Sequence, residues 1–505
     1  MRLHGNRKEE ARDCFAARER KMEEIRVKVK EGILSGRTDG EVAVFMGVPY
    51  AAPPVGDLRW RGPQPAEPWD GVREAVECAP MAVQIPIPGS LMEKHEMSED
   101  CLYLNIWAPD DMSEKHAVLV WFYGGALQGG CADVPSLSGK AYARDGVVLV
   151  TVSYRVGVFG FMCHPDMKGE DPDGFVGNFG HRDQMAALEW IRDNISQFGG
   201  DPDRVTISGQ SAGSASCCAL MNAPAAKGLF HAAILHSGDV FQPERDVPLS
   251  SAESWGEQLA TKFGCSTLDE FRKVPVDVLY ADGDPMMKHM HQFAAAVIDG
   301  AFLPESQGDL LLNDRCYGVP VIIGTNLDEG SRFAAEQYIP AITSRLGIPV
   351  DLYDEEPDID HKANALARDY WYARHLVWAR IRSREYGLPS WEYVFARRLT
   401  AQGAFHGMEI PYTFSTLDAE PDFGKPLPYT SDDRQLSALM HSYWVNFIKN
   451  FDPNSGGLPF WPEKSQGDLH MQFDAVSEVR DDIIRDTDRT ITPAVDRWMR
   501  SRIRN

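Results

Sequence analysis

The sequence predicts an α/β fold in which a central, mostly parallel β-sheet is flanked by helices. Three runs of almost unbroken apolar residues are typical of strands covered on both faces: residues 102–107, 117–122 and 147–153. Residues 184–195 carry apolar side chains at helical spacing and are followed by the glycine stop Phe198-Gly-Gly200. A β-branched run from Val205 to Ser208 then leads through a Gly/Ser turn into small, helix-compatible residues. Strand, helix, strand, turn and helix in this order indicate a parallel sheet.

The flanking segments add further strands to this sheet. Short strand-like runs come first, at residues 32–35 and 42–46. They precede the Pro/Gly-rich segment 48–56, which we expect to be extended because each proline removes a backbone donor and restricts its predecessor. Later strands are predicted where short apolar runs recur: residues 232–235, 319–323 and 393–396.

The domain organisation follows from what lies between and before these strands. Two long, mainly helical stretches, residues 239–318 and 331–390, are predicted to be insertions that form a lid and a pocket over one end of the sheet. The charge-rich start of the chain carries a sparse apolar stripe and predicts an N-terminal helical extension over residues 1–27. Because no linker or internal repeat interrupts residues 28–505, we expect residues 1–505 to form a single domain.

The composition is typical of a soluble globular protein. Apolar residues make up 43% and charged residues 25% of the 505 residues, which are ordinary values. The net charge of -23 argues against nucleic acid or an anionic membrane as a partner, since both need clustered Lys and Arg. No apolar run is long enough for a membrane span, and the first residues lack the apolar region of a secretory signal, so we expect a cytoplasmic protein. Nine cysteines without C-x-x-C spacing are expected to be reduced thiols.

The turn Gly209-Gln-Ser-Ala-Gly213 is the first candidate for chemistry. Gly209 and Gly213 allow a turn too tight for side chains on either flank, so that Ser211 is held in a strained conformation with its hydroxyl exposed at the start of a helix. This G-x-S-x-G pattern is common by itself, but the preceding strand and the following helix are the context that a nucleophilic serine requires. Ser211 is therefore the predicted nucleophile.

A serine hydroxyl needs a base, a group that orients the base, and donors for the oxyanion. Of the nine histidines after Ser211, only His406 lies in a glycine-bounded loop directly after a predicted sheet strand, where active sites of open α/β sheets are found. The loop after the strand at 319–323 offers two acids, Asp328 and Glu329, and their spacing does not separate them. The Gly124-Gly125 turn after the strand at 117–122 offers backbone N–H groups for the oxyanion.

A series of short motifs runs in order along residues 28–465: Phe45 to Gly56, Ser98 to Asn105, Tyr123 to Ala126, Gly177 to Gly180 with Asp183 and Gln184, Asn194 with Phe198 to Pro202, Gly209 to Gly213, Asp328 to Gly330, His406 with Gly407, Tyr443 to Phe447, Asp452 to Asn454, and Trp461 with Pro462. With these motifs the chain resembles the type-B carboxylesterase and cholinesterase family of the α/β-hydrolase superfamily.

The resemblance implies an α/β-hydrolase fold and a serine carboxylic-ester hydrolase that works through an acyl-enzyme. Among the two acids it implies Glu329 as the triad member, with Ser211 as nucleophile and His406 as base. It assigns the oxyanion hole to the backbone N–H groups of Gly125, Ala126 and Ala212. We expect no cofactor and no metal, and a small, neutral, apolar ester as the substrate. A homo-oligomer is compatible with the sequence.

Three positions depart from the family pattern. Gln210 stands where the family usually has Glu, so one negative charge is missing beside the nucleophile, which weakens the case for choline-like cationic substrates. Ala126 replaces a glycine of the oxyanion turn, and its methyl group predicts poor turnover of bulky tertiary-alcohol esters. Cys78 and Cys101 correspond to a family disulfide, and both are expected as thiols in a reducing cytosol.

Two alternatives stand beside the esterase interpretation. One is a catalytically silent relative that serves as a binding protein, against which the intact Ser211, Glu329 and His406 argue. The other is a serine amidase or peptidase on the same fold, which uses the same nucleophile and base.

Overall fold

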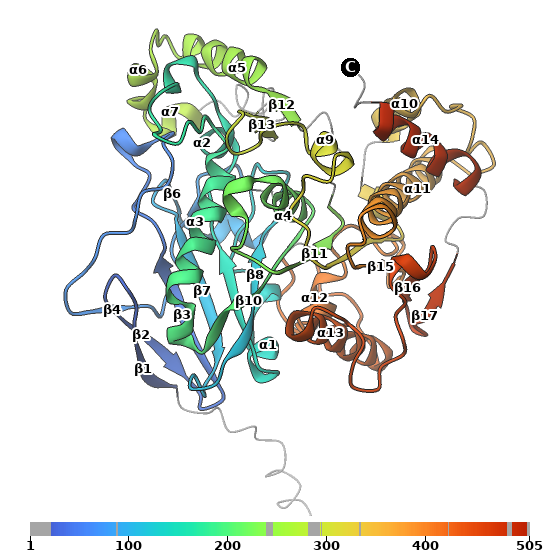
Figure 1. Ribbon diagram of the computed structural model, residues 1–505, viewed down its shortest axis with the longest axis horizontal. Helices are drawn as coiled ribbons and strands as arrows, with labels where there is room; N and C mark the ends of the chain where they lie inside the picture. The colour runs from blue at the N-terminus through green and yellow to red at the C-terminus, as the bar shows by residue number, and fades with distance from the viewer. Residues whose placement is uncertain are drawn as a thin grey trace, which may run out of the picture.

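The computed structural model describes residues 22–86, 89–238, 246–280, 293, 295–332, 335–422, 424–481 and 487–501 of the chain. Its centre is one large sheet (Figure 1) built from β1 (Glu23–Lys28), β2 (Ile33–Thr38), β3 (Val42–Pro49), β4 (Val72–Glu74), β7 (Tyr103–Pro109), β8 (His116–Phe122), β9 (Val147–Val152), β10 (Gly200–Gln210), β11 (Ala232–His236), β14 (Val321–Asn326), β15 (Ser390–Phe395), β16 (His470–Phe473) and β17 (Glu478–Arg480). The strand order is β1-β2-β3-β7-β9-β8-β10-β11-β14-β15-β16-β17, with β4 beside β2. Neighbouring strands run parallel from β9 to β16 and antiparallel at both edges. The predicted central, mostly parallel sheet is confirmed.

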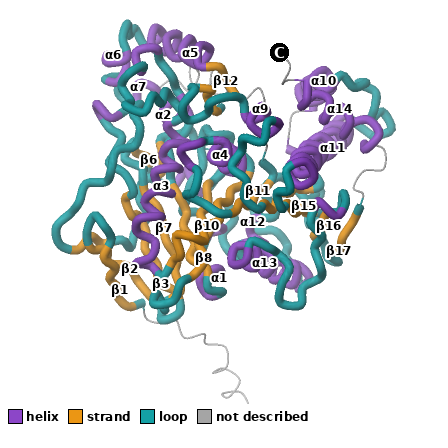
Figure 2. The backbone as a smooth tube through the Cα atoms, viewed as in Figure 1, coloured by secondary structure: helices purple, strands orange, loops and turns teal. Residues whose placement is uncertain are grey.

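Helices cover both faces of this sheet, as Figures 1 and 2 show. One face carries α3 (Phe179–Asn194), α4 (Ala212–Asn222) and α11 (Ile359–Arg380), and the other carries α1 (Lys140–Arg144), α12 (Ile410–Thr413) and α13 (Ser431–Asn450). Within β8, Val118 and Val120 belong to the first core, whereas Leu119 and Trp121 belong to the second. This alternation explains the unbroken apolar runs of the sequence, because a strand covered on both faces has no solvent side.

The remaining elements lie outside the main sheet and its covering helices. Two small parallel pairs are formed by β5 (Met81–Ala82) with β6 (Met97–Ser98), and by β12 (Asp246–Pro248) with β13 (Ala296–Ile298). The other helices are α2 (Gly157–Phe161), α5 (Leu249–Lys262), α6 (Leu268–Arg272), α7 (Val276–Tyr280), α9 (Gln307–Leu312), α10 (Ala335–Leu346) and α14 (Thr487–Ser501). None of the helices in the described residues is both long and apolar enough to cross a membrane.

The predicted N-terminal helix over residues 1–27 is wrong in the part that the structure describes. Residues 1–21 lie outside the described residues, and Glu23–Lys28 form strand β1, which pairs antiparallel with β2. Val27 is buried and Ile25 is half-buried, two positions apart, while their neighbours are more exposed. Inward-facing residues two positions apart are typical of a strand. In the sequence alone, the many charged residues around these few apolar ones resemble an amphipathic helix.

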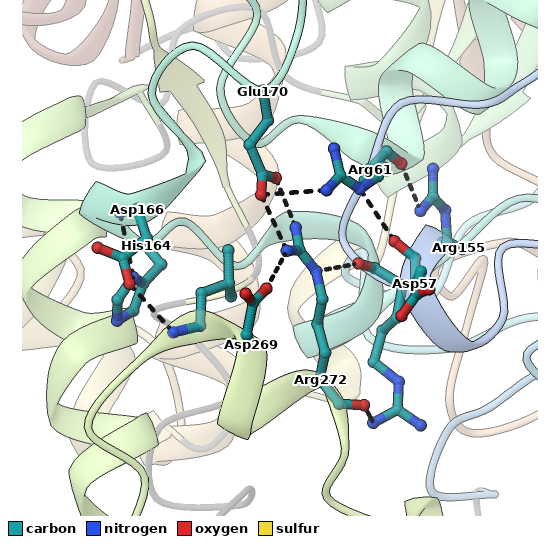
Figure 3. A network of polar contacts seen from close by, with 10 residues as sticks. Asp57, Arg61, Arg155, His164, Asp166, Glu170, Asp269 and Arg272 are labelled. Carbon is teal, nitrogen blue, oxygen red and sulfur yellow. Dashed lines mark hydrogen bonds and ion pairs between the residues drawn. The ribbon is translucent and has the colours of Figure 1, made fainter.

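The described part of the predicted insertion 239–318 lies over the end of the sheet where β10 meets α4. Its helices α5, α6 and α7 share one apolar cluster with Leu127 and Ala212. A polar network fixes α6 to the body (Figure 3): Arg272 binds Glu170 at 2.5 Å, and its Nε donates to the backbone oxygen of Arg59 at 3.0 Å. These contacts join α6 to the loops that carry Arg59 and Glu170.

The ion pair of Arg155 and Asp183 lies entirely inside the protein. Arg155 Nε and Nη2 donate to Asp183 Oδ2 and Oδ1 at 2.8 and 2.7 Å, and the two side chains are 3% and 0% exposed. Replacing Asp183 by Asn leaves a buried guanidinium without its counter-charge, which is expected to cost about 3–5 kcal/mol of unfolding free energy. At about 2 cal/mol/K of unfolding entropy per residue this lowers Tm by a few degrees.

Thermal unfolding followed by differential scanning fluorimetry checks this expectation. The matched control is Asp193→Asn, because Asp193 forms only exposed contacts with Arg192 and Lys30. It should change the unfolding free energy by less than about 1 kcal/mol. Equal Tm values for the two variants would contradict the expected contribution of the buried ion pair to the unfolding free energy.

Candidate active site

Ser211 occupies the sharp turn between β10 and α4. Its backbone has φ 56° and ψ -121°, a conformation that non-glycine residues rarely adopt. A Cβ at Gly209 would lie 2.4 Å from the carbonyl carbon of Gly213, and a Cβ at Gly213 would lie 2.0 Å from the oxygen of Phe122. Both glycines are therefore required by backbone packing, as the sequence predicted. The Ser211 N–H donates to the oxygen of His236 at 2.8 Å, which anchors the turn to β11.

His406 and Glu329 come together from loops after two neighbouring strands, β15 and β14. His406 Nδ1 lies 2.5 Å from Glu329 Oε2, and the carboxylate is fully buried. Glu329 Oε1 accepts from the Asn326 N–H and from the Thr325 hydroxyl, each at 2.8 Å. Burial alone would raise the pKa of this carboxyl, but His406 and the Asn326 N–H outweigh it and hold the pKa of Glu329 below its ordinary value. Glu329 is therefore a carboxylate that can orient the imidazole.

Asp328, the second acid of the same loop, faces away from His406. Its carboxylate binds Arg398 at 2.7 and 2.8 Å and accepts from the Ala404 N–H at 2.8 Å. A Cβ at Gly403 would lie 2.1 Å from Asp328 Oδ2, so this glycine makes room for the carboxylate. Asp328 thus stabilises the loop that carries His406. The sequence did not decide which of the two acids orients His406, and in the structure only Glu329 contacts it among these two.

The loop of His406 is also tied to β14 by Asn326. The Asn326 side-chain amide donates to the backbone oxygen of Phe405 at 2.7 Å and to buried Glu409 at 2.5 Å. These bonds connect the residue before His406 to the strand end that carries Glu329. Sequence reasoning missed this role, because Asn326 lies 79 positions from Phe405 and carries no motif of its own.

The turn after β8 brings Gly125 and Ala126 to the same end of the sheet. Both have positive φ, 122° for Gly125 and 58° for Ala126. A Cβ at the preceding Gly124 would lie 2.4 Å from the backbone oxygen of Gln210, so the turn packs directly against the elbow of Ser211. Among the residues that the structure describes, none accepts a hydrogen bond from the N–H groups of Gly125, Ala126 or Ala212. Three backbone donors are thus open at one place.

Gln210 makes a contact that sequence reasoning did not anticipate. Its side-chain nitrogen lies 3.0 Å from His406 Nε2. Because His406 Nδ1 faces the Glu329 carboxylate and carries the proton, Nε2 accepts this hydrogen bond. The sequence singled out Gln210 only as a missing charge. Trp371 of α11 is a second unforeseen neighbour, with its ring edge-on to His406 at a centroid distance of 5.7 Å.

The parallel sheet, with a strained serine between β10 and α4 and loops converging at the strand ends, defines the chain as an α/β-hydrolase. The particular family follows from comparison with known proteins. Residues 23–347 and 349–488 match the profile described as the carboxylesterase family. The chain belongs to this family, and the resemblance seen in the sequence is confirmed.

Individual relatives agree with this membership. The chain is 32% identical to the para-nitrobenzyl esterase of Bacillus subtilis over 492 residues, covering 92% of this chain and 95% of that one. It is 32% identical to the fumonisin B1 esterase of Sphingopyxis macrogoltabida over 468 residues, covering 88% and 85%. A solved structure of a PNB esterase superposes with a TM-score of 0.81 at 31% identity, covering 92% of this chain and 99% of that chain.

Proposed function

We propose that the protein is a serine carboxylic-ester hydrolase that acts through an acyl-enzyme on Ser211. The observation that carries the proposal is the 2.5 Å contact of His406 with buried Glu329 at the end of the sheet where Ser211 projects. Three segments far apart in sequence meet there, and each supplies a group that nucleophilic catalysis needs. The likeness to proteins named esterases supports the same reaction class.

In this mechanism His406 takes the proton of Ser211 as the hydroxyl attacks the ester carbonyl. His406 then gives that proton to the leaving alkoxide, and Glu329 stabilises the imidazolium formed in between. Water hydrolyses the acyl-enzyme by the same route. The open N–H groups of Gly125, Ala126 and Ala212 would bind the oxyanion of both tetrahedral intermediates.

The resting site needs one rearrangement before attack. No hydrogen bond joins Ser211 Oγ to His406 within the described part of the chain, and the Gln210 amide holds His406 Nε2 instead. Proton transfer from Ser211 requires Nε2 to exchange its contact with Gln210 for one with the serine hydroxyl. Such tightening on substrate binding is common, since catalytic hydrogen bonds are often long in free enzymes.

The expected substrate is a small, neutral, apolar ester. Gln210 carries no charge, so the site lacks an anion beside the nucleophile that would favour a cationic alcohol. The residues flanking the oxyanion turn and the elbow, Leu127 and Ala212, belong to an apolar cluster that includes Phe159 and Phe293. An apolar lining with few polar groups favours apolar acyl or alcohol groups.

Replacing Gln210 by Glu is expected to shift the pH dependence of kcat/KM. A carboxylate beside His406 stabilises the imidazolium and raises its pKa, and His406 must be neutral to act as base. The acid limb of the profile therefore moves to higher pH. Gln210→Met is the matched control, because it removes the amide without adding charge. An acid limb at the same pH in the Glu and Met variants would contradict the placement of this side chain.

Replacing Ala126 by Gly is expected to widen the oxyanion turn. Ala126 has a positive φ of 58°, which glycine adopts without strain, and removal of its methyl group frees space beside the scissile bond. Turnover of tert-butyl acetate relative to n-butyl acetate should rise by about tenfold or more. Ala215→Gly on α4 is the control for general loosening. An unchanged ratio of the two turnover rates in Ala126→Gly would show that this methyl group does not exclude tertiary-alcohol esters.

Matched p-nitrophenyl esters and p-nitroanilides with the same acyl group test the reaction class. The proposal predicts faster turnover of the ester at every acyl length from two to twelve carbons. A preference for the anilide would favour a serine amidase on the same fold. Absence of turnover for all pairs would favour the silent binding protein.

A further inference from the structure

A compact cluster of metal-binding residue types lies beside the oxyanion turn, outside the site described above. His95 Nε2, Cys131 Sγ and a carboxylate oxygen of Asp133 all lie within 4.8 Å of one another. Asp133 Oδ1 is 2.5 Å from Cys131 Sγ and 3.1 Å from His95 Nε2. Cys131 is buried, and the Asp133 side chain is 9% exposed. Two segments that are distant in sequence thus place three ligand types around one point.

The thiol of Cys78 is not one of the three members of this cluster. Burial and the negative charge of Asp133 raise its pKa. Cys78 and Cys131 are both free thiols, and so is Cys101, the expected partner of Cys78 in the family disulfide. The expectation that Cys78 and Cys101 are thiols agrees with the structure.

The orientation of His95 is that of a metal ligand. Its Nδ1 lies 3.1 Å from the backbone oxygen of Leu91, which only accepts hydrogen bonds, so Nδ1 carries the proton. Nε2 then faces Asp133 Oδ1, which accepts and cannot donate. Two acceptors at 3.1 Å repel each other unless a proton or a cation lies between them. A histidine that donates its other N–H to a carbonyl is the usual outer-shell arrangement of a metal site.

We propose that His95, Cys131 and Asp133 bind a Zn²⁺-class divalent ion. Nitrogen, sulfur and oxygen ligands suit this ion, and tetrahedral bonds of about 2.0–2.3 Å place ligand atoms about 3.3–3.8 Å apart. The distances from Asp133 Oδ1 to Cys131 Sγ and to His95 Nε2, 2.5 and 3.1 Å, are shorter than this, so the side chains must move apart by up to about 1 Å to admit the ion. From the sequence we expected no metal site, so the proposed site differs from that expectation.

The ion would act as a structural clamp on the oxyanion turn. Cys131 and Asp133 directly follow this turn, while His95 belongs to the segment between β5 and β6. Gln84 of the same region already binds Gly130 through both amide atoms, at 2.7 and 2.8 Å. A metal would add a second link between the two loops.

Two simpler explanations cover only part of the cluster. An ion pair of protonated His95 with Asp133 accounts for the 3.1 Å contact but not for the buried Cys131 thiol at the same carboxylate. A disulfide between Cys78 and Cys131 leaves the contact of His95 with Asp133 unexplained. The experiment separates both from a metal site.

Metal binding to the full chain tests the proposal without reference to esterase activity. The reduced protein is purified, loaded with Zn²⁺, dialysed and analysed by mass spectrometry for metal content, and a second sample is titrated with Co²⁺. We expect about one zinc per chain, and cobalt spectra with visible ligand-field bands and a sulfur-to-cobalt charge-transfer band. Cys131→Ser and His95→Ala should each weaken Zn²⁺ binding by about 100-fold or more. The control Cys265→Ser, a thiol at the end of α5, should bind as the wild type does.

Three results would overturn the proposal. The first is reduced wild-type protein without stoichiometric zinc and without a sulfur-to-cobalt band, which leaves only the ion pair. The second is a Cys78–Cys131 disulfide, found by peptide mass mapping of protein purified without reductant, together with a failure of that protein to bind metal after it is reduced. The third is equal zinc binding by Cys131→Ser, His95→Ala and Cys265→Ser. If a ligand variant fails to fold, the cobalt titration of the wild type still decides.

Discussion

Replacement of Ser211 by Ala is expected to lower kcat for p-nitrophenyl esters by about 10⁴- to 10⁶-fold, with a much smaller change in KM. The hydroxyl is the only group in the proposed mechanism that forms a covalent bond to the substrate, so its loss removes the acyl-enzyme route. The residual rate would come from the N–H groups of Gly125, Ala126 and Ala212 acting on water attack. Steady-state kinetics on the purified variant measures the loss.

The matched control is Ser208→Ala on the same strand. The Ser208 side chain is buried, and its hydroxyl has no hydrogen-bond partner within the described residues, so its loss should leave kcat within about a factor of two. A Ser211→Ala variant that retains more than a tenth of the wild-type kcat would contradict the assignment of the nucleophile.

Replacement of Glu329 by Gln is expected to lower kcat by about 10³- to 10⁴-fold. The amide has the size of the carboxylate, but it removes the charge that orients His406 and stabilises its imidazolium. Because the side chain is fully buried, no water replaces that charge. Steady-state kinetics and a Tm measurement on the same sample separate loss of chemistry from loss of folding.

Asp328→Asn is the control for this second prediction. Asp328 binds Arg398 and the Ala404 N–H, so its replacement should lower Tm and reduce kcat by about tenfold at most. A larger catalytic loss in Asp328→Asn than in Glu329→Gln would show that the loop before His406, and not the Glu329 charge, controls the reaction.

Much of this arrangement could be predicted because it depends on local patterns. The central strands appear in the sequence as apolar runs, since burial on both faces leaves no polar positions in them. The turn at Ser211 is marked by glycines that backbone packing demands, at Gly209 and Gly213. His406 is marked in the same way by Gly403, which makes room for Asp328.

The rest depends on contacts between distant segments. Asp328 and Glu329 are adjacent, and only the loop conformation turns one toward Arg398 and the other toward His406. Strand β1 has only six residues with two inward-facing side chains, a pattern too short to exclude a helix. The cluster at His95 and Asp133 joins two loops and follows no recognised ligand spacing, so the sequence gives no signal for it.

The central claim, that Ser211 is the nucleophile, is tested most directly by covalent labelling. The enzyme is inactivated with one equivalent of an organophosphate, digested, and mapped by peptide mass spectrometry while residual activity is measured. The account predicts a single phosphoryl adduct on the peptide that contains Ser211, with activity lost in proportion to labelling and no adduct in Ser211→Ala. Loss of activity with the adduct on another residue, or an active enzyme that forms no adduct on Ser211, would contradict it.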